Sequence, residues 1–123
     1  MKFRPVLSIE PVVEKDILAE EFKAGREFGR VCVGKDHFFY RTKLTINYIS
    51  YKNVERVFRR VECIDMKMCC AAGEIQLHSI VICAADSELA AIEVPTEGCA
   101  IAILKHFEDN WPSVKIGKKS KED

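Results

Sequence analysis

The chain has 123 residues, of which 48% are hydrophobic and 31% are charged. This length fits one domain, and the composition excludes a disordered chain, a collagen and a coiled coil. The 19 basic and 19 acidic residues cancel. A chain without net charge lacks the long-range field that attracts nucleic acid or an anionic membrane, so neither is expected as a partner.

No uncharged run is long enough for a membrane helix or the core of a signal peptide. The longest run, residues 75–85, has 11 residues and contains Gln76 and His78, whereas a membrane helix needs about 20 apolar residues. Near the N-terminus the longest run is Pro5 to Ile9, and no small-residue cleavage site follows it. The sequence therefore predicts a cytoplasmic protein without a transmembrane segment.

The segment before Gly29 differs in pattern from the rest of the chain. Between Pro11 and Gly25 its apolar side chains recur at intervals of three and four residues, as on one face of a helix. These side chains are Val13, Ile17, Leu18 and Phe22. Acidic residues stand near the start and Lys23 near the end, which suits the helix dipole. Residues 1–28 are therefore predicted to form an N-terminal helical extension that packs on the following domain.

From Gly29 onward the pattern becomes that of β-strands. The segment 37–41 (HFFYR) is rich in aromatic residues, as half-buried strands are. Strands are predicted at 30–34, 37–41, 45–50, 75–83 and 88–94. Short strands at regular spacing indicate an antiparallel meander rather than βαβ units.

Residues 52–62 fit both a helix and a strand. Val54, Val57, Phe58 and Val61 follow the helical spacing i, i+3, i+4 and i+7. As a strand, the segment would carry apolar and charged side chains on both faces, so that neither face is uniformly apolar. Periodicity alone favours the helix.

A second amphipathic helix is predicted after Pro95. Thr96 is a suitable N-cap, Glu97 suits the positive end of the helix, and Pro112 ends it. One stripe of this helix is apolar and must lie against the core. The stripe comprises Ala100, Ile103, Leu104, Phe107 and Trp111.

A strand meander closed by one C-terminal amphipathic helix resembles the layout of pleckstrin-homology-like (PH-like) domains. The local match lies in residues 31–57, where a Gly-Lys-Asp-His turn leads into the aromatic strand. There Tyr51, Val54 and Val57 resemble the Y-x-x-I-x-x-V pattern of bacterial PH-like and GRAM-like proteins.

This resemblance implies an α+β, mainly β fold: a PH-like roll of about seven antiparallel strands in two sheets, closed by the C-terminal helix. It assigns residues 29–116 to the PH-like domain. It also implies that residues 52–62 form a strand, because the roll needs that edge to close. The remaining residues, 117–123, are predicted to be a disordered charged tail.

Lipid-binding members of this family carry a basic motif across the first hairpin. The nearest match here is Lys35, Arg41 and Lys43, with a lysine in place of the final arginine. The loop is also too short for a roomy headgroup pocket. These residues are therefore a weak lipid-type motif, and binding to a membrane surface is not expected.

Charge is balanced overall but divided along the chain. Residues 31–60 carry a net charge of +5 and residues 61–95 a net charge of −5. The densest basic cluster comprises Lys52, Arg56, Arg59 and Arg60. Three interpretations remain open: protection of an exposed edge strand, binding of an acidic segment from a partner or a second copy, or a site for nucleic acid or anionic lipid.

The cysteines and histidines do not have metal-site spacing. The six cysteines are Cys32, Cys63, Cys69, Cys70, Cys83 and Cys99, and the histidines are His37, His78 and His106. The only close pair, Cys69 and Cys70, would point apart in a strand. We therefore predict reduced, mostly buried thiols, with no metal and no cofactor.

No catalytic motif for hydrolase, metalloprotease, nucleotide or dinucleotide chemistry occurs in the sequence. The adjacent carboxylates Glu20-Glu21 and Glu108-Asp109 fall on helix faces expected to be solvated, not in convergent acid-base pairs. The sequence predicts a non-catalytic PH-like binding module for protein–protein association or self-association. The alternative is a pocket of the roll that binds a small ligand or an anionic lipid, or has an unrecognised enzymatic role.

Overall fold

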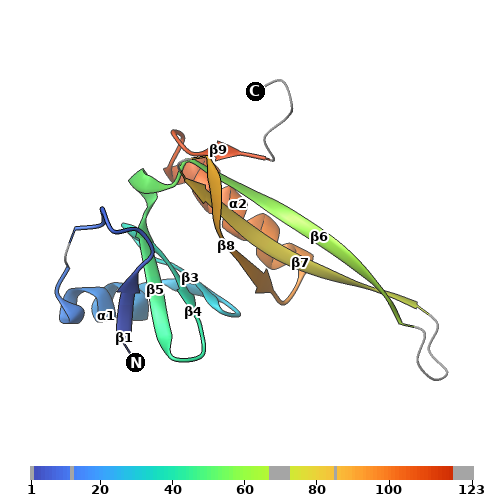
Figure 1. Cartoon of the computed structure of the whole chain (residues 1–123), viewed down its shortest axis with the longest axis horizontal. Helices are drawn as coiled ribbons and strands as arrows, with labels where there is room; N and C mark the ends of the chain where they lie inside the picture. Colours follow the sequence, from blue (N-terminus) through green and yellow to red (C-terminus); the bar gives the residue numbers. More distant parts are fainter. Residues whose placement is uncertain (1, 12, 67–72, 85, 118–123) are drawn as a thin grey trace.

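The computed structural model describes residues 2–11, 13–66, 73–84 and 86–117, which form two β-sheets and two α-helices (Figure 1). This confirms the predicted α+β, mainly β class. In chain order the elements are β1 (Lys2–Pro5), α1 (Lys15–Ala24), β2 (Arg26–Phe28), β3 (Val31–Val33), β4 (His37–Arg41), β5 (Thr45–Ser50), the 3₁₀ turn η1 (Tyr51–Asn53), β6 (Arg56–Met66), β7 (Gly73–Ala84), β8 (Ser87–Val94), α2 (Glu97–Asn110) and β9 (Lys115–Ile116).

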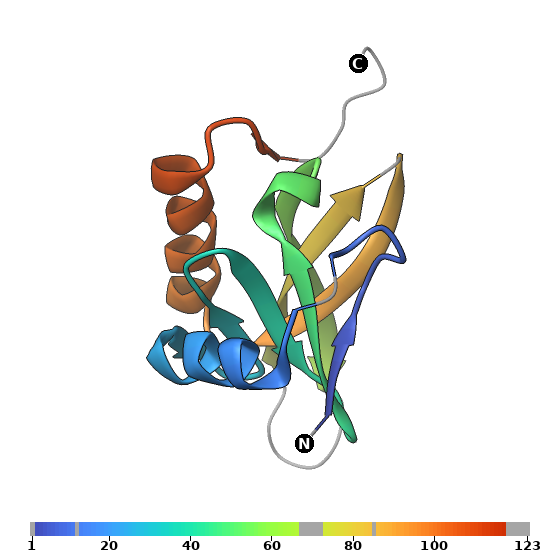
Figure 2. The same cartoon turned by 90° about the vertical axis from the view of Figure 1, so that its left-hand side faces the viewer.

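The first sheet has the strand order β1-β5-β4-β3-β2. Strand β1 runs parallel to β5, and the other neighbours are antiparallel. Figure 2 shows β1, in dark blue, beside β5. Side chains alternate along β4, so Phe38 and Phe39 face opposite sides of this sheet. Each side of the sheet therefore carries its own apolar cluster.

The second sheet has the strand order β8-β7-β6-β9. Strands β6 and β7 pair without interruption from Arg56 opposite Cys83 to Met66 opposite Gly73. Strand β9 is parallel to β6 and pairs with it at Arg56 and Val57. The prediction of a purely antiparallel meander is therefore wrong for the two short strands β1 and β9.

The N-terminal segment contains the predicted helix, packed on the domain, but it is not helical throughout. The helix begins at Lys15 rather than at Pro11, and strands β1 and β2 on either side of it belong to the first sheet. Strand β1 brings Phe3 within 6.3 Å of the Phe22 ring and 6.2 Å of the Phe39 ring, measured between centroids. Strands of three or four residues are too short to show a period, so only their pairing reveals them.

The structure confirms the strand interpretation of residues 52–62, in the form of η1 followed by β6. Val57 and Phe58 are both buried although neighbouring strand residues face opposite sides. Val57 lies in the main core, whereas Phe58 is covered on the other face by the guanidinium of Arg60, 5.7 Å from its ring centroid. Apolar groups on both faces of the strand produced the misleading helical spacing.

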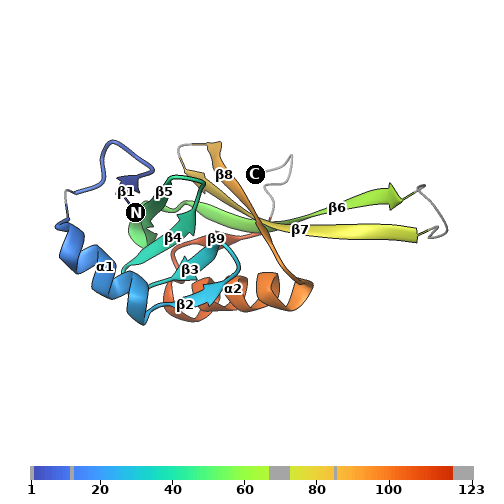
Figure 3. The ribbon, with the colours of Figure 1, turned by 90° about the horizontal axis from the view of Figure 1, so that it is seen from below.

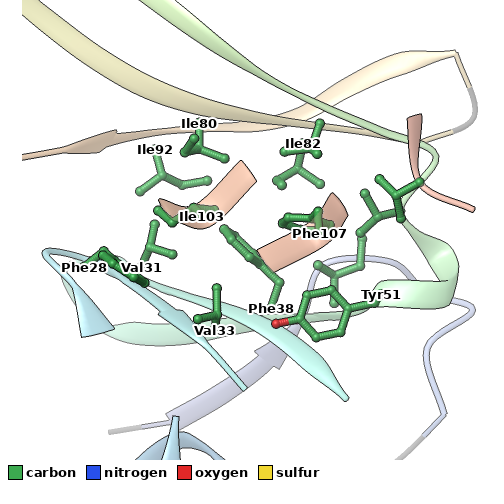
Figure 4. Packing of buried hydrophobic residues seen from close by; sticks show 14 of the residues in the cluster. Phe28, Val31, Val33, Phe38, Tyr51, Ile80, Ile82, Ile92, Ile103 and Phe107 are labelled. Atoms are coloured by element: carbon green, nitrogen blue, oxygen red, sulfur yellow. The ribbon is translucent and has the colours of Figure 1, made fainter. Parts of the chain in front are cut away.

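Helix α2 fills the space between the two sheets (Figure 4). Its N-cap is confirmed, because the Cys99 N–H donates to Thr96 Oγ1 at 3.2 Å. Phe107 is fully buried, with its ring centroid 5.8 Å from that of Phe38 and 5.2 Å from that of Tyr51. The predicted stripe is confirmed at Ala100, Ile103 and Phe107, while Leu104 and Trp111 are half-buried.

A second, smaller cluster lies on the other side of the first sheet, beneath α1. It comprises Leu18, Cys32, Phe39, Ile46 and Tyr48, with Phe3, Val13 and Phe22 packed against it. The rings of Phe22 and Phe39 meet edge to face at a centroid distance of 5.4 Å. Helix α1 is therefore fixed to the sheet by its own apolar contacts, separate from the core around α2.

Candidate functional site

The β6–β7 hairpin extends well beyond the rest of its sheet (Figures 1 and 3). Strand β8 pairs with β7 only between His78 and Ala84, and β9 pairs with β6 only at Arg56 and Val57. In the described part of the chain, residues 62–66 and 73–77 therefore have only each other as strand partners. We call these two segments the hairpin arm.

Beyond β9, the outer edge of β6 has no strand partner among the described residues. Val57 directs its backbone groups toward β9, because its carbonyl accepts a hydrogen bond from the Gly117 N–H at 3.0 Å. Backbone groups alternate along a regular strand, so those of Arg59, Val61 and Cys63 point to the same outer side. No described strand pairs with them there. We call residues 59–63 the β6 edge.

The basic residues predicted as one cluster are placed on different surfaces. Arg59 Nη1 donates to Glu97 Oε1 at 2.8 Å, on the side of β6 that faces α2. Its neighbour Arg60 points to the opposite face and pairs with Glu88 on β8. Arg56 Nη1 donates to the Gly117 carbonyl at 2.8 Å.

The fourth member of that cluster, Lys52, lies in η1, outside β6. Two of the arginines are therefore bound to carboxylates of the same chain. These two arginines are therefore less available to an acidic partner. They nevertheless lie on β6, the strand whose outer edge has no described partner beyond β9.

The weak lipid-type motif is also divided. Arg41 and Lys43 line a surface groove of about 980 Å³ together with Arg30, Glu93 and Pro95. Arg41 Nη2 donates to the Gly29 carbonyl at 3.2 Å. Lys35 precedes the other end of β4 and lines a different groove, beside α1. The structure thus brings Arg30, which the sequence pattern did not single out, to Arg41 and Lys43.

An ion pair between Glu21 and His37 joins α1 to the start of β4. Glu21 Oε1 lies 2.7 Å from His37 Nδ1, and Glu21 Oε2 accepts the N–H groups of Asp36 and His37 at 3.0 and 2.7 Å. The two side chains are only 12% and 10% exposed. The expectation that Glu21 lies on a solvated helix face is therefore wrong, because the turn before β4 folds back onto α1.

This environment shifts both pKa values. The hydrogen bond that His37 donates to Glu21 raises the pKa of His37 above its usual 6.5 despite burial, and the charges of Glu21, Glu10 and Asp36 act in the same direction. Burial by itself would raise the pKa of Glu21. Its hydrogen bonds with His37 and the Asp36 N–H outweigh burial, so this pKa falls below its usual 4.5. Both shifts favour the charged forms of the two side chains in the folded chain.

Stability is expected to depend on pH through this pair. The raised pKa of His37 stabilises the fold fully below pH 6.5, and this contribution is lost as pH rises through the folded value. The lowered pKa of Glu21 stabilises the fold above pH 4.5, and this contribution is lost as pH falls through the folded value. The pair thus contributes most between pH 4.5 and 6.5.

Denaturant unfolding of the wild type and of Glu21→Gln across this pH range measures the effect. The glutamine keeps the size and an acceptor oxygen, but it removes the charge that holds the pKa of His37 high. The difference in free energy of unfolding between the two proteins should be largest between pH 4.5 and 6.5 and shrink on both sides. A constant difference over the whole range would show that the pair is not coupled to stability.

The cysteines differ from the prediction of mostly buried thiols. Cys32 is buried, and burial raises its pKa to about 11. Cys63 is exposed, and Cys83 and Cys99 are half-buried. Cys69 and Cys70 lie outside the described residues. Within the described part of the chain, no three His, Cys, Asp or Glu side chains lie close enough to hold a metal ion.

Comparison with known proteins assigns no function to this chain, so a proposal must rest on the chain's own geometry. No protein-family model, no curated protein and no solved structure matches this chain. In the ranges that the structure describes, neither helix has the length and apolar character to cross a membrane. The features that distinguish the molecule are its hairpin arm with the open β6 edge, the Glu21–His37 pair and the groove beside Arg41.

Proposed function

We propose that this chain is a non-catalytic, PH-like binding module that associates with protein through its β6–β7 hairpin, including self-association. The observation that carries the proposal is the extension of this hairpin past both neighbouring strands. The groove beside Arg41 is the weaker candidate, because one of its arginines is already bound to the Gly29 carbonyl and an acidic residue, Glu93, shares its lining.

The packing of α2 supports the PH-like part of the proposal. A roll of two sheets leaves one side of its interior open, and an amphipathic helix must cover it. Here α2 buries Ala100, Ile103 and Phe107 against residues of both sheets. A strand meander followed by one such helix is the layout expected of a PH-like domain.

The hairpin arm supports the binding part. A two-stranded ribbon without a third strand or a helix is marginally stable in water. An open strand edge is also a template for pairing with another chain. Val61 is 40% exposed and Cys63 is exposed at the base of the arm, so its surface is not uniformly charged. Pairing with another protein would satisfy both the backbone groups and these side chains.

The arrangement of polar groups supports a non-catalytic role. The Glu21 carboxylate accepts two backbone N–H groups and faces His37, so it is engaged in holding α1 to β4. The buried carboxylate of Glu10 likewise accepts hydrogen bonds from the N–H and Oγ of Ser50 and from Asn53 Nδ2. Both carboxylates fulfil structural roles.

Shortening the hairpin tests the proposal. Residues 61–78 are replaced by Asn-Gly, which joins Arg60 to Ser79, a pair whose backbone groups face each other in the register of β6 and β7, by a two-residue turn. No described core residue is removed, so the shortened chain should unfold at nearly the wild-type temperature. Light scattering at low ionic strength should then find association in the wild type and a monomer in the shortened chain.

Two results would count against the proposal. A shortened chain that associates as strongly as the wild type places the interaction elsewhere. A wild type that remains monomeric at every concentration contradicts self-association. High salt serves as the control on the wild type, since exposed charge pairs that support association are screened there.

A further inference from the structure

We infer that the partner of the β6 edge is a second copy of this chain, joined so that Arg60 of each copy lies opposite Glu62 of the other. This inference rests on the proposed function and specifies its partner and register. It starts from the open backbone groups of Arg59, Val61 and Cys63, which point away from β7. These groups can pair with an identical edge.

Symmetry restricts how two identical edges can join into one continuous sheet. A two-fold axis normal to the sheet makes the two β6 strands antiparallel, and the residue at the axis then faces its own copy. With Val61 at the axis, Arg60 faces Glu62 and Arg59 faces Cys63. By symmetry, the dimer contains two such Arg60–Glu62 pairs. Opposite charges directly across two strands stabilise the pairing.

Neighbouring registers are less favourable. Moving the axis by one residue to Arg60 sets two guanidinium groups against each other. Moving it to Glu62 sets two carboxylates against each other. Like charges directly opposite destabilise a strand pair. The sequence Arg59-Arg60-Val61-Glu62-Cys63 is thus complementary to itself in the register centred on Val61.

The outer face of β6 is compatible with this register, in which the paired stretch ends before Val57 because β9 occupies that part of the edge. Arg60 lies on the outer face of the sheet, where its guanidinium stands over the Phe58 ring. In the dimer, Arg60 exchanges its exposed contact with Glu88, which lies beyond β7 on β8, for Glu62 of the second copy on the other side of β6. Val61, which is partly exposed in one copy, would be covered by Val61 of the second copy. Such an isologous contact closes as a dimer.

Charge reversal tests the register. In Arg60→Glu and in Glu62→Arg, each dimer would contain two like-charge pairs, so each variant alone should dissociate about tenfold more readily than the wild type. In a mixture of the two variants, one copy carries carboxylates at positions 60 and 62 and the other carries guanidinium groups at both, which restores both opposite-charge pairs. Analytical ultracentrifugation should find monomers for each variant and a heterodimer for the mixture.

Matched controls reverse charges away from the edge. Lys23→Glu and Glu27→Arg change exposed side chains on α1 and β2 and should leave dimerisation unchanged. Thermal unfolding checks that every variant is folded. Loss of dimer in the single variants with recovery in the mixture supports the register.

The remaining outcomes separate the inference from the proposed function. One outcome is that the wild type and both charge variants associate equally, with association lost only in the shortened chain. In that case the register is wrong and the proposed function stands. If the wild type shows no association, the proposed self-association itself is wrong.

Discussion

Replacing Phe107 with alanine is expected to lower the free energy of unfolding by about 3–5 kcal/mol. Phe107 is 0% exposed in α2 and touches aromatic side chains from both ends of the core, Phe38 on β4 and Tyr51 in η1. Removing its ring leaves a cavity that these neighbours cannot fill without moving. The loss is a large share of the about 5–15 kcal/mol that stabilises a typical domain.

Ile101→Ala provides the matched control on the same helix. Ile101 is 52% exposed, so its truncation removes few contacts and should cost about 0.5 kcal/mol or less. Urea unfolding followed by circular dichroism measures both variants. Equal and small effects would show that α2 does not hold the two sheets together, which would remove the main support for a roll closed by this helix.

The second large effect is expected at the other cluster. Leu18→Ala should lower the free energy of unfolding by about 2–5 kcal/mol. Leu18 is 1% exposed and inserts from α1 among Phe39, Ile46 and Tyr48 of the first sheet. Because these residues lie on the face of the sheet opposite to α2, this cluster is a separate contribution to stability.

Ile17→Ala is the control for α1. Ile17 is 55% exposed and adjacent to Leu18, so both variants place alanine, the best helix former, in the same turn of α1. If Leu18→Ala cost no more than Ile17→Ala, α1 would be only loosely attached. The Glu21–His37 pair would then be the principal contact that holds the helix.

Local patterns in the sequence were sufficient for the central strands and for α2. The strands 37–41 and 45–50 have the predicted limits, because aromatic and β-branched residues alternate there between clear turn signals. Thr96 and the apolar stripe after it gave the start and the buried face of α2. In these segments, each side chain's environment follows from its position within its own element.

Features that depend on distant pairing could not be predicted. Strand β1 exists because it pairs with β5, more than 40 residues later, and β9 because it pairs with β6. The Glu21–His37 pair joins residues 16 positions apart, so neither residue stood out locally. For residues 52–62 the helical spacing was misleading, and the resemblance to PH-like domains favoured the correct strand.

The sequence predicted only part of the candidate site. The cluster around Arg59 and Arg60 identified the relevant strand, and an exposed edge was one of its interpretations. Only the sheet order reveals which backbone groups of β6 lack a strand partner in the described part of the chain. The complementarity of Arg60 and Glu62 acquires meaning once that edge is known. A linear pattern cannot distinguish it from ordinary charge mixing.

Sedimentation equilibrium of the unmodified chain over a wide range of concentrations tests association through the hairpin most directly. At low ionic strength, the average mass should rise with concentration from the 14.0 kDa of one chain toward twice that value. High salt should return it toward the monomer, because exposed charge pairs are screened. A mass that stays at 14.0 kDa at every concentration in low salt would contradict the account.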